Sequence, residues 1–309
     1  MKRFERIPVP VIPTFVGALT LSNVYAGLGY TWVRHLTMWA AMIFLLCYLV
    51  KLIRFPQTCR AEYEQVVPCS LYAAVAMVLM ILGSYLFEYI PALGKAVWAS
   101  AIALHACHIL IFTYRNVIRK REISTFVPSW YVTYNGIMVS CVVGGAMNAA
   151  GFLKYIVYYG ILIYFIILPF MIRRLITVDV KAQVYHTMAV LLAPCSLCVV
   201  SYLNIIKEPK AVVVSLLYAC VLASLLFIII MLPKFFSFRF TPGFAGMTFP
   251  MAIGIVASNK MAGFLSANGS ELLAGFIKQL AGIQIYLTTM IVGFVLLNFV
   301  IMLFRIEQK

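Results

Sequence analysis

The stretch "FAGMTFPMAIGIVAS" (residues 244–258) indicates the fold. It is apolar along most of its length, it contains Pro250, and small residues gather on one side when it is drawn as a helix. One bulky ring, Phe249, stands among these small neighbours. Small residues in a membrane helix allow close approach of other helices or line a cavity, whereas bulky apolar side chains contact lipid. The stretch therefore predicts an inner helix of a membrane protein.

The composition supports a membrane protein over the whole chain. Hydrophobic residues make up 64% of the 309 residues, charged residues 11%, and the mean hydropathy is +1.01. A soluble domain carries about 25% charged residues. The net charge of +15 does not indicate nucleic-acid binding, because the basic residues cluster at the ends of apolar segments. We expect an all-α integral membrane protein with a single transmembrane domain over residues 1–309.

Ten hydrophobic segments have about the length that crosses a bilayer as a helix. They cover about residues 10–30, 37–54, 67–87, 95–114, 130–150, 154–172, 185–206, 211–232, 244–263 and 282–304. The connection at about 264–281 contains most of "SELLAGFIKQLAG", which predicts a short amphipathic helix on the membrane surface.

Lysine and arginine set the expected orientation. The N-terminus, the even-numbered connections and the C-terminus carry 17 of these residues, and the odd-numbered connections carry 7. Because cytoplasmic loops are richer in lysine and arginine, both termini are predicted to lie in the cytoplasm and the chain to lie in the cell membrane.

The odd-numbered segments are small and polar, and the even-numbered segments are rich in bulky apolar residues. This alternation predicts five helical hairpins, each with one inner and one outer helix. Every odd-numbered segment also carries a proline near its start or within it. These prolines predict helix kinks. For those close to a helix start, the alternative is that the membrane helix tolerates proline without a functional bend. These prolines are Pro13, Pro68, Pro128, Pro194 and Pro250.

Helical spacing places small residues on one face of each odd-numbered segment, and five such faces around an axis enclose a narrow, weakly polar pore. The predicted lining residues are Gly17, Thr20, Asn23, Ala73, Ala76, Thr133, Gly136, Ser140, Gly144, Thr187, Cys198, Ser201, Ala245, Ala252 and Val256. Tight packing without a pore is the alternative. No charged residue lies in the middle of a segment, whereas coupled cation carriers keep a carboxylate there. The pore therefore suits anions.

Two other motifs are weaker. Cys195 and Cys198 form a C-x-x-C inside an apolar segment, without a second ligand pair. His105 and His108 lie one turn apart on an outer segment, with no nearby carboxylate in the sequence. We expect packing and hydrogen-bonding roles for these residues, and no metal or other cofactor.

Four stretches together resemble the tellurite-resistance/dicarboxylate transporter family. They are "IPTFVGALTLSNVY" (12–25), "VPSWYVTYNGIMV" (127–139), "LLAPCSLCVVSYLNI" (191–205) and "FAGMTFPMAIGIVAS" (244–258). The resemblance implies hairpins in quasi-fivefold order around a central pore, and a homotrimer with one pore per subunit. It also implies that Phe249, before Pro250, blocks the pore as a gate.

We therefore expect an anion channel or channel-like exporter. A secondary transporter of dicarboxylate, sulfite or tellurite-type oxyanions is the alternative, because amides and hydroxyls can also hold such a substrate. The sequence contains no recognisable nucleophile–base pair, paired catalytic carboxylates or metal cluster, so an enzyme is not expected. For Phe249 itself, ordinary packing between helices is the alternative to gating.

Overall fold

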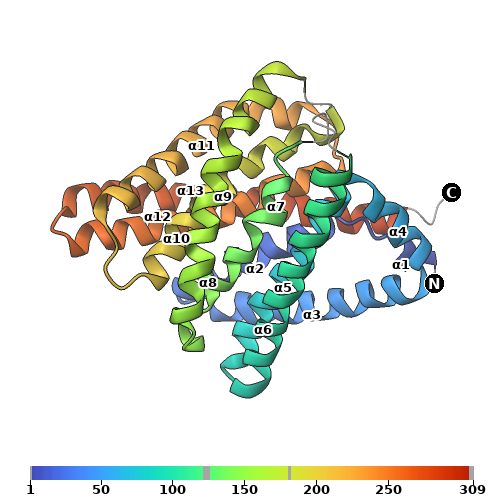
Figure 1. Ribbon diagram of the computed structural model, residues 1–309, viewed down its shortest axis with the longest axis horizontal. Coiled ribbons are helices and arrows are strands. Elements are labelled where there is room, and N and C mark those ends of the chain that lie inside the picture. The colour runs from blue at the N-terminus through green and yellow to red at the C-terminus, as the bar shows by residue number, and fades with distance from the viewer. Residues whose placement is uncertain (1, 121–125, 180–181, 306–309) are drawn as a thin grey trace.

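The computed structural model describes residues 2–120, 126–179 and 182–305. Every regular element within these ranges is a helix, and long helices surround shorter central ones (Figure 1). The first half contains α1 (Lys2–Glu5), α2 (Val11–Gly27), α3 (Thr31–Arg54), α4 (Pro56–Glu64), α5 (Val66–Phe87), α6 (Pro91–Phe112), the π-helix η1 (Thr113–Lys120), α7 (Trp130–Tyr134), η3 (Gly136–Met138), α8 (Val139–Val143) and η4 (Gly145–Met147). The second half contains α9 (Ala150–Thr177), η5 (Ala182–Leu191), α10 (Leu192–Ile205), α11 (Ala211–Ser237), η6 (Pro242–Met247), α12 (Thr248–Ala267) and α13 (Glu271–Arg305).

Seven helical segments of the described chain are long and apolar enough to cross a membrane. They are Thr31–Arg54, Val66–Phe87, Pro91–Lys120, Ala150–Thr177, Tyr185–Ile205, Ala211–Ser237 and Glu271–Leu303. Three predicted spans are not among them. Val11–Gly27 is apolar but has only 17 residues, the region after Pro128 is broken into short pieces, and α12 contains Asn259 and Lys260.

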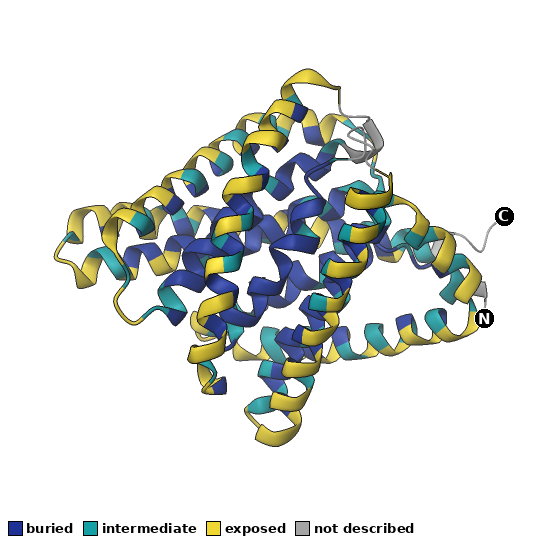
Figure 2. Ribbon diagram, viewed as in Figure 1, coloured by how far each residue is buried: buried dark blue, intermediate teal, exposed yellow. Residues whose placement is uncertain are grey.

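Burial separates inner helices from outer helices as the sequence predicts (Figure 2). In the most apolar part of α5, 72% of the residues are buried, and in that of Tyr185–Ile205, 83%. The corresponding shares for the spans of α3, α6, α9, α11 and α13 lie between 22% and 33%. The bulky side chains of these outer helices are therefore left to face lipid or another protein chain.

Four of the five prolines stand at the same place in their helices. Pro13, Pro68, Pro194 and Pro250 are each the third residue of an α-helix, and Pro128 precedes α7 by two residues. Backbone N–H groups in a first turn have no partner within the helix, so proline is tolerated there without bending it. The two later prolines mark the points where the 3-10 helices η5 and η6 pass into α10 and α12.

The prediction of one helix over 130–150 is wrong. The structure has two five-residue α-helices there, α7 and α8, separated and followed by 3-10 turns. The first break follows Asn135, whose side-chain Nδ2 donates to the carbonyl of Gly160 on α9, 2.9 Å away. The last 3-10 turn ends at Asn148, whose backbone is left-handed with a φ of 52°.

The prediction of a separate surface helix before the last span is also wrong. Residues 271–305 form one uninterrupted helix of 35 residues, α13. The helix continues through Gly275 and Gly282. An added Cβ at either glycine would meet no other group, so both lie on open faces of the helix. The connection expected at residues 55–66 contains a helix of its own, α4, which begins at Pro56.

Consecutive inner and outer helices pack against one another. α2 contacts α3, α5 contacts α6, α10 contacts α11, and α12 contacts α13. The inner helices also contact one another, with α12 between α2 and α10. The start of α2, the start of α5 and the junction of η6 with α12 are thereby brought to one region of the molecule.

Candidate functional site

A cavity of about 790 Å³ lies where the five odd-numbered segments begin. Residues of α2, of the start of α5, of the stretch before and within α7, of η5, and of η6 with α12 all line it. Its walls are mostly apolar. They include Pro10, Pro13, Val16, Val67, Pro68, Leu71, Met77, Val127, Ser129, Val132, Thr187, Val190, Ala245, Gly246, Phe249 and Pro250.

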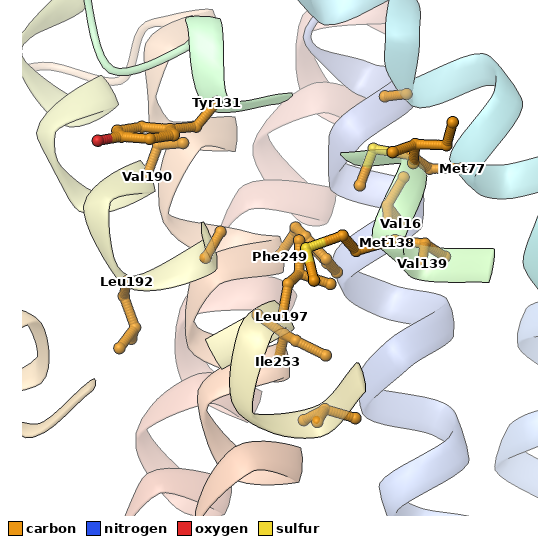
Figure 3. Packing of buried hydrophobic residues seen from close by; sticks show 14 of the residues in the cluster. Val16, Met77, Tyr131, Met138, Val139, Val190, Leu192, Leu197, Phe249 and Ile253 are labelled. Atoms are coloured by element: carbon orange, nitrogen blue, oxygen red, sulfur yellow. The ribbon is translucent and has the colours of Figure 1, made fainter. Parts of the chain in front are cut away.

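Phe249 belongs both to the cavity wall and to the tightly packed core. Only 6% of its surface is exposed. Figure 3 shows the ring in the middle of the packed side chains, with Met138 and Leu197 next to it in the view. These residues and Ile253 belong to the same buried cluster. The cavity therefore reaches the ring of Phe249, and apolar side chains of η3 and α10 pack beside that ring.

Gly17 allows α2 to approach α12 closely at Phe249. A Cβ atom added to Gly17 would lie 2.7 Å from the backbone nitrogen of Phe249 and 2.8 Å from the Cβ of Thr248. Real Cβ atoms do not come this close to other groups. The backbone that carries the ring is thus held against α2, and the Thr248 hydroxyl donates to the carbonyl of Ala245, 2.8 Å away.

Two charged side chains line the cavity, both near the end of α9. Arg174 is buried and donates from Nη1 to the carbonyl of Val178 at 2.7 Å. Asp179, which is exposed, lines the same region. The rest of the described lining carries no formal charge.

The sequence from residue 9 to residue 303 matches the voltage-dependent anion channel family. The chain belongs to this family. The match covers nearly the whole chain and confirms the resemblance to the tellurite-resistance/dicarboxylate transporter family. Among curated proteins, none matches the chain. Together with the apolar spans, family membership establishes a multi-pass membrane protein of an anion channel and transporter family.

The cavity beside Phe249 brings together part of the predicted site. Of the predicted lining residues, Thr187 and Ala245 reach the cavity, beside the predicted gate Phe249. Three of the predicted proline positions line it as well, Pro13, Pro68 and Pro250. The first turns of the inner helices thus form its wall.

Other predicted lining residues lie away from the channel cavity. Ala73 and Ala76 line a separate pocket of about 270 Å³ with Leu104 and His108 of α6. An added Cβ at Gly136 would meet His105 and Met77, and one at Gly144 would meet Leu153 and Trp98. Ala252 packs in a second cluster between α2, α12 and α13. Cys198 is fully buried, and Val256 packs against the main core.

The predicted polar lining residues of the channel are bound to protein groups. The hydroxyls of Thr20, Ser140 and Ser201 donate to the carbonyls of Val16, Ile137 and Met138. Thr133 donates to the carbonyl of Ser70 at 3.3 Å. Asn23 accepts a hydrogen bond of 2.8 Å from Nε of Arg34 on α3. In this structure the hydroxyls therefore stabilise irregular or closely packed backbone.

Several cavity residues of the channel were not identified from the sequence. Val67 and Leu71 lie on a different side of α5 from the small face formed by Ala73 and Ala76, and Met77 lies at the edge of that face. Val190 lies in a 3-10 helix, where the α-helical spacing used to choose faces does not apply. Among the lysines and arginines that set the predicted orientation, Arg174 belongs to a connection between segments. Nothing in the local sequence indicates that its side chain is buried.

The two remaining motifs have local partners. Sγ of Cys195 lies 3.3 Å from the carbonyl oxygen of Leu192, and both cysteines of the C-x-x-C are buried. His105 donates from Nε2 to the carbonyl of Thr133 at 2.8 Å, and Nδ1 of His108 lies 3.0 Å from the hydroxyl of Tyr63. Within the described chain, no group of three or more metal-ligating side chains gathers.

Proposed function

We propose that the protein is an anion channel whose pore runs along the inner helices and is closed by Phe249. One observation carries the proposal: five inner segments meet at one cavity, and the ring of Phe249 lies where that cavity meets the packed core. A narrow apolar constriction excludes water, and a dry constriction is a barrier to ions. Movement of this ring therefore opens the path, and its present position corresponds to a closed state.

The proposed architecture has ten membrane spans, arranged as five hairpins in quasi-fivefold order. The hairpin packing of consecutive helices and the burial of the inner ones support it. Ten spans are an even number, which places both termini on one side of the membrane. We assign that side to the cytoplasm from the excess of lysine and arginine.

The proposed pore selects by dehydration and by charge at its mouth. The described cavity wall beyond Arg174 and Asp179 is uncharged, so an anion crossing the ring finds no fixed counter-charge there. At the cytoplasmic mouth the carboxylate of Asp179 lies in the same lining as Arg174, so the excess of lysine and arginine over the whole cytoplasmic side raises the local concentration of anions. Large, weakly hydrated monovalent anions should then pass more easily than strongly hydrated ones.

Some predicted lining residues, such as Ala252 and Ser201, lie behind the cavity wall. They come to line the path only if the inner helices shift.

We further propose a homotrimer, with one pore in each subunit. The exposed bulky side chains of the outer helices supply an apolar surface that another subunit can cover as well as lipid can, among them Trp32, Trp39 and Phe170. The mass of the protein in mild detergent tests this proposal, and a monomeric mass that persists after gentle extraction contradicts it.

The channel proposal is tested by recording currents from purified protein in planar bilayers under a chloride gradient. A conductance whose reversal potential lies near the chloride equilibrium potential supports it. A reversal potential near that of potassium overturns the anion assignment. Saturable anion uptake without current overturns the channel in favour of a carrier. The Phe249→Ala variant, described below, supplies measurable current if the wild-type pore is closed.

A further inference from the structure

A second large hollow lies on the outside of the helix bundle, between η1, α7 and α9. Its volume is about 680 Å³. Its lining includes Asn116, Val117, Phe126, Trp130, Ile163, Ile166, Ile167, Phe170, Arg173 and Arg174. We call this hollow the α9 crevice. The exposed side chains of Ile166 and Phe170 continue its wall onto the outer face of α9.

The two ends of the α9 crevice differ in chemistry. Isoleucines and aromatic rings form most of its wall. The rings of Phe126 and Trp130 pack edge to face, with their centroids 4.9 Å apart. Arg173 and Arg174 stand at the end of α9 that lies on the proposed cytoplasmic side. Arg173 is exposed, and the described lining of the crevice contains no aspartate or glutamate. A hollow that is apolar along its length and cationic at one end matches an acyl chain with an anionic headgroup.

We propose that the α9 crevice binds an anionic phospholipid of the cytoplasmic leaflet. One acyl chain lies along Ile163 and Ile167, and the phosphate is held by Arg173, whose side chain is exposed. A planar guanidinium donates two parallel hydrogen bonds to a phosphate, which favours arginine at such a site. A free phosphate ion would leave the long apolar wall uncovered.

The α9 crevice also touches the central cavity. Arg174 and Val178 belong to the walls of both, so these two side chains separate the hollows. A lipid phosphate bound in the crevice adds negative charge beside the mouth of the cavity and so reduces anion entry. This consequence for flux rests on the proposed channel function, whereas lipid binding itself does not.

Lipid binding is tested on the full-length, delipidated protein by native mass spectrometry. Phosphatidylglycerol and phosphatidylcholine with the same acyl chains are added in turn. We expect wild-type protein to retain phosphatidylglycerol at least five-fold better. Arg173→Gln should remove that preference, and Ile163→Trp should reduce the retention of both lipids because the indole fills the crevice.

Two control variants separate the site from general effects. Arg54→Gln removes an exposed charge at the end of α3, and Leu162→Trp adds an indole on α9 at an exposed position outside the crevice lining. Both should bind lipid as the wild type does. Equal retention of the two lipids by wild type, unchanged retention in Arg173→Gln and Ile163→Trp, or a change of oligomeric mass in place of lipid loss would each overturn the proposal.

Flux is then measured in vesicles of phosphatidylcholine with and without phosphatidylglycerol. The anionic lipid should slow chloride efflux through wild type and Arg54→Gln by the same factor, and should slow Arg173→Gln less. Because binding is read from mass alone, it can succeed or fail whether or not the protein conducts anions. Bound lipid with equal slowing of all three proteins would refute the link to the cavity mouth.

Discussion

Phe249 stands where a ring can act either as a gate or as part of the core. It lines the cavity, yet only 6% of its surface is exposed. Truncation of a phenylalanine in a packed core costs about 3–5 kcal/mol of stability. A ring that fills a conduit instead leaves an open path when it is removed. A gating role therefore predicts added current with little loss of stability. A packing role predicts a large loss of stability with no added current.

We predict that Phe249→Ala raises anion conductance by about ten-fold or more with a modest loss of stability. Single-channel conductance and the melting temperature of purified protein measure the two effects. Ile253→Ala is the matched control, because Ile253 lies one turn further along α12 and is fully buried. It should lower the melting temperature without adding current. A Phe249→Ala variant that behaves in the same way would assign Phe249 to packing alone.

Gly17 provides a test of the contact that holds the Phe249 backbone. Alanine normally stabilises a helix by about 0.5–1 kcal/mol relative to glycine. At Gly17 the new methyl group would lie 2.7 Å from the backbone of Phe249, so overpacking should reverse the sign and cost about 1–3 kcal/mol. Gly27→Ala is the control, because nothing lies within 4 Å of its added Cβ. Equal melting temperatures for the two variants would mean that α2 yields freely at this contact.

At the scale of elements, a partly buried ion pair fastens α4 to the bundle. Lys51 of α3 is fully buried, and its Nζ donates to Oε1 of Glu62 at 2.6 Å and to the carbonyl of Ile7 at 2.7 Å. The hydroxyl of Tyr72 on α5 donates to the other carboxylate oxygen at 2.8 Å. One network therefore joins the chain before α2 to α3, α4 and α5.

Breaking this network should be costly. We predict that Lys51→Met lowers the free energy of unfolding by about 3 kcal/mol, because it leaves the Glu62 carboxylate without its cation. Adding Glu62→Gln should recover part of the loss. Arg60→Gln breaks an exposed pair with Glu64 and should cost less than about 1 kcal/mol. Thermal unfolding in detergent measures all of them, and a Lys51→Met loss no larger than that of Arg60→Gln would contradict the prediction.

Helix identity was easier to predict than helix geometry. Long apolar runs and the alternation of small and bulky residues identified the inner and outer elements, since burial follows side-chain size. The faces were harder. On α5 the small face at Ala73 and Ala76 turns towards α6, so the small side chains there leave a separate pocket and do not line the cavity at Phe249. The broken region after Pro128 depends on the Asn135 contact with Gly160, which is 25 residues away and has no signal in the local pattern.

For the whole molecule, the orientation in the membrane can be measured by thiol labelling. Native Cys59 is a poor reporter, because it is buried and burial raises the pKa of its thiol, so little reactive thiolate forms near neutral pH. Gln57→Cys on α4 and Asn268→Cys after α12 place thiols at exposed positions. We expect an impermeant maleimide added to intact cells to label the second variant, and the first only after lysis. The reverse pattern would invert the proposed topology.

The length of α13 has a consequence for the kind of membrane the protein suits. Its 35 residues extend ~52 Å, against a hydrocarbon layer of about 30 Å and the ~26 Å of α2. Tilting takes up part of this mismatch, more in a thinner bilayer than in a thicker one, and the remaining turns extend past the hydrocarbon layer. α13 packs along α12, the helix that begins with Thr248 and Phe249. A change in bilayer thickness therefore changes the force that α13 exerts on the start of α12, where Phe249 lies.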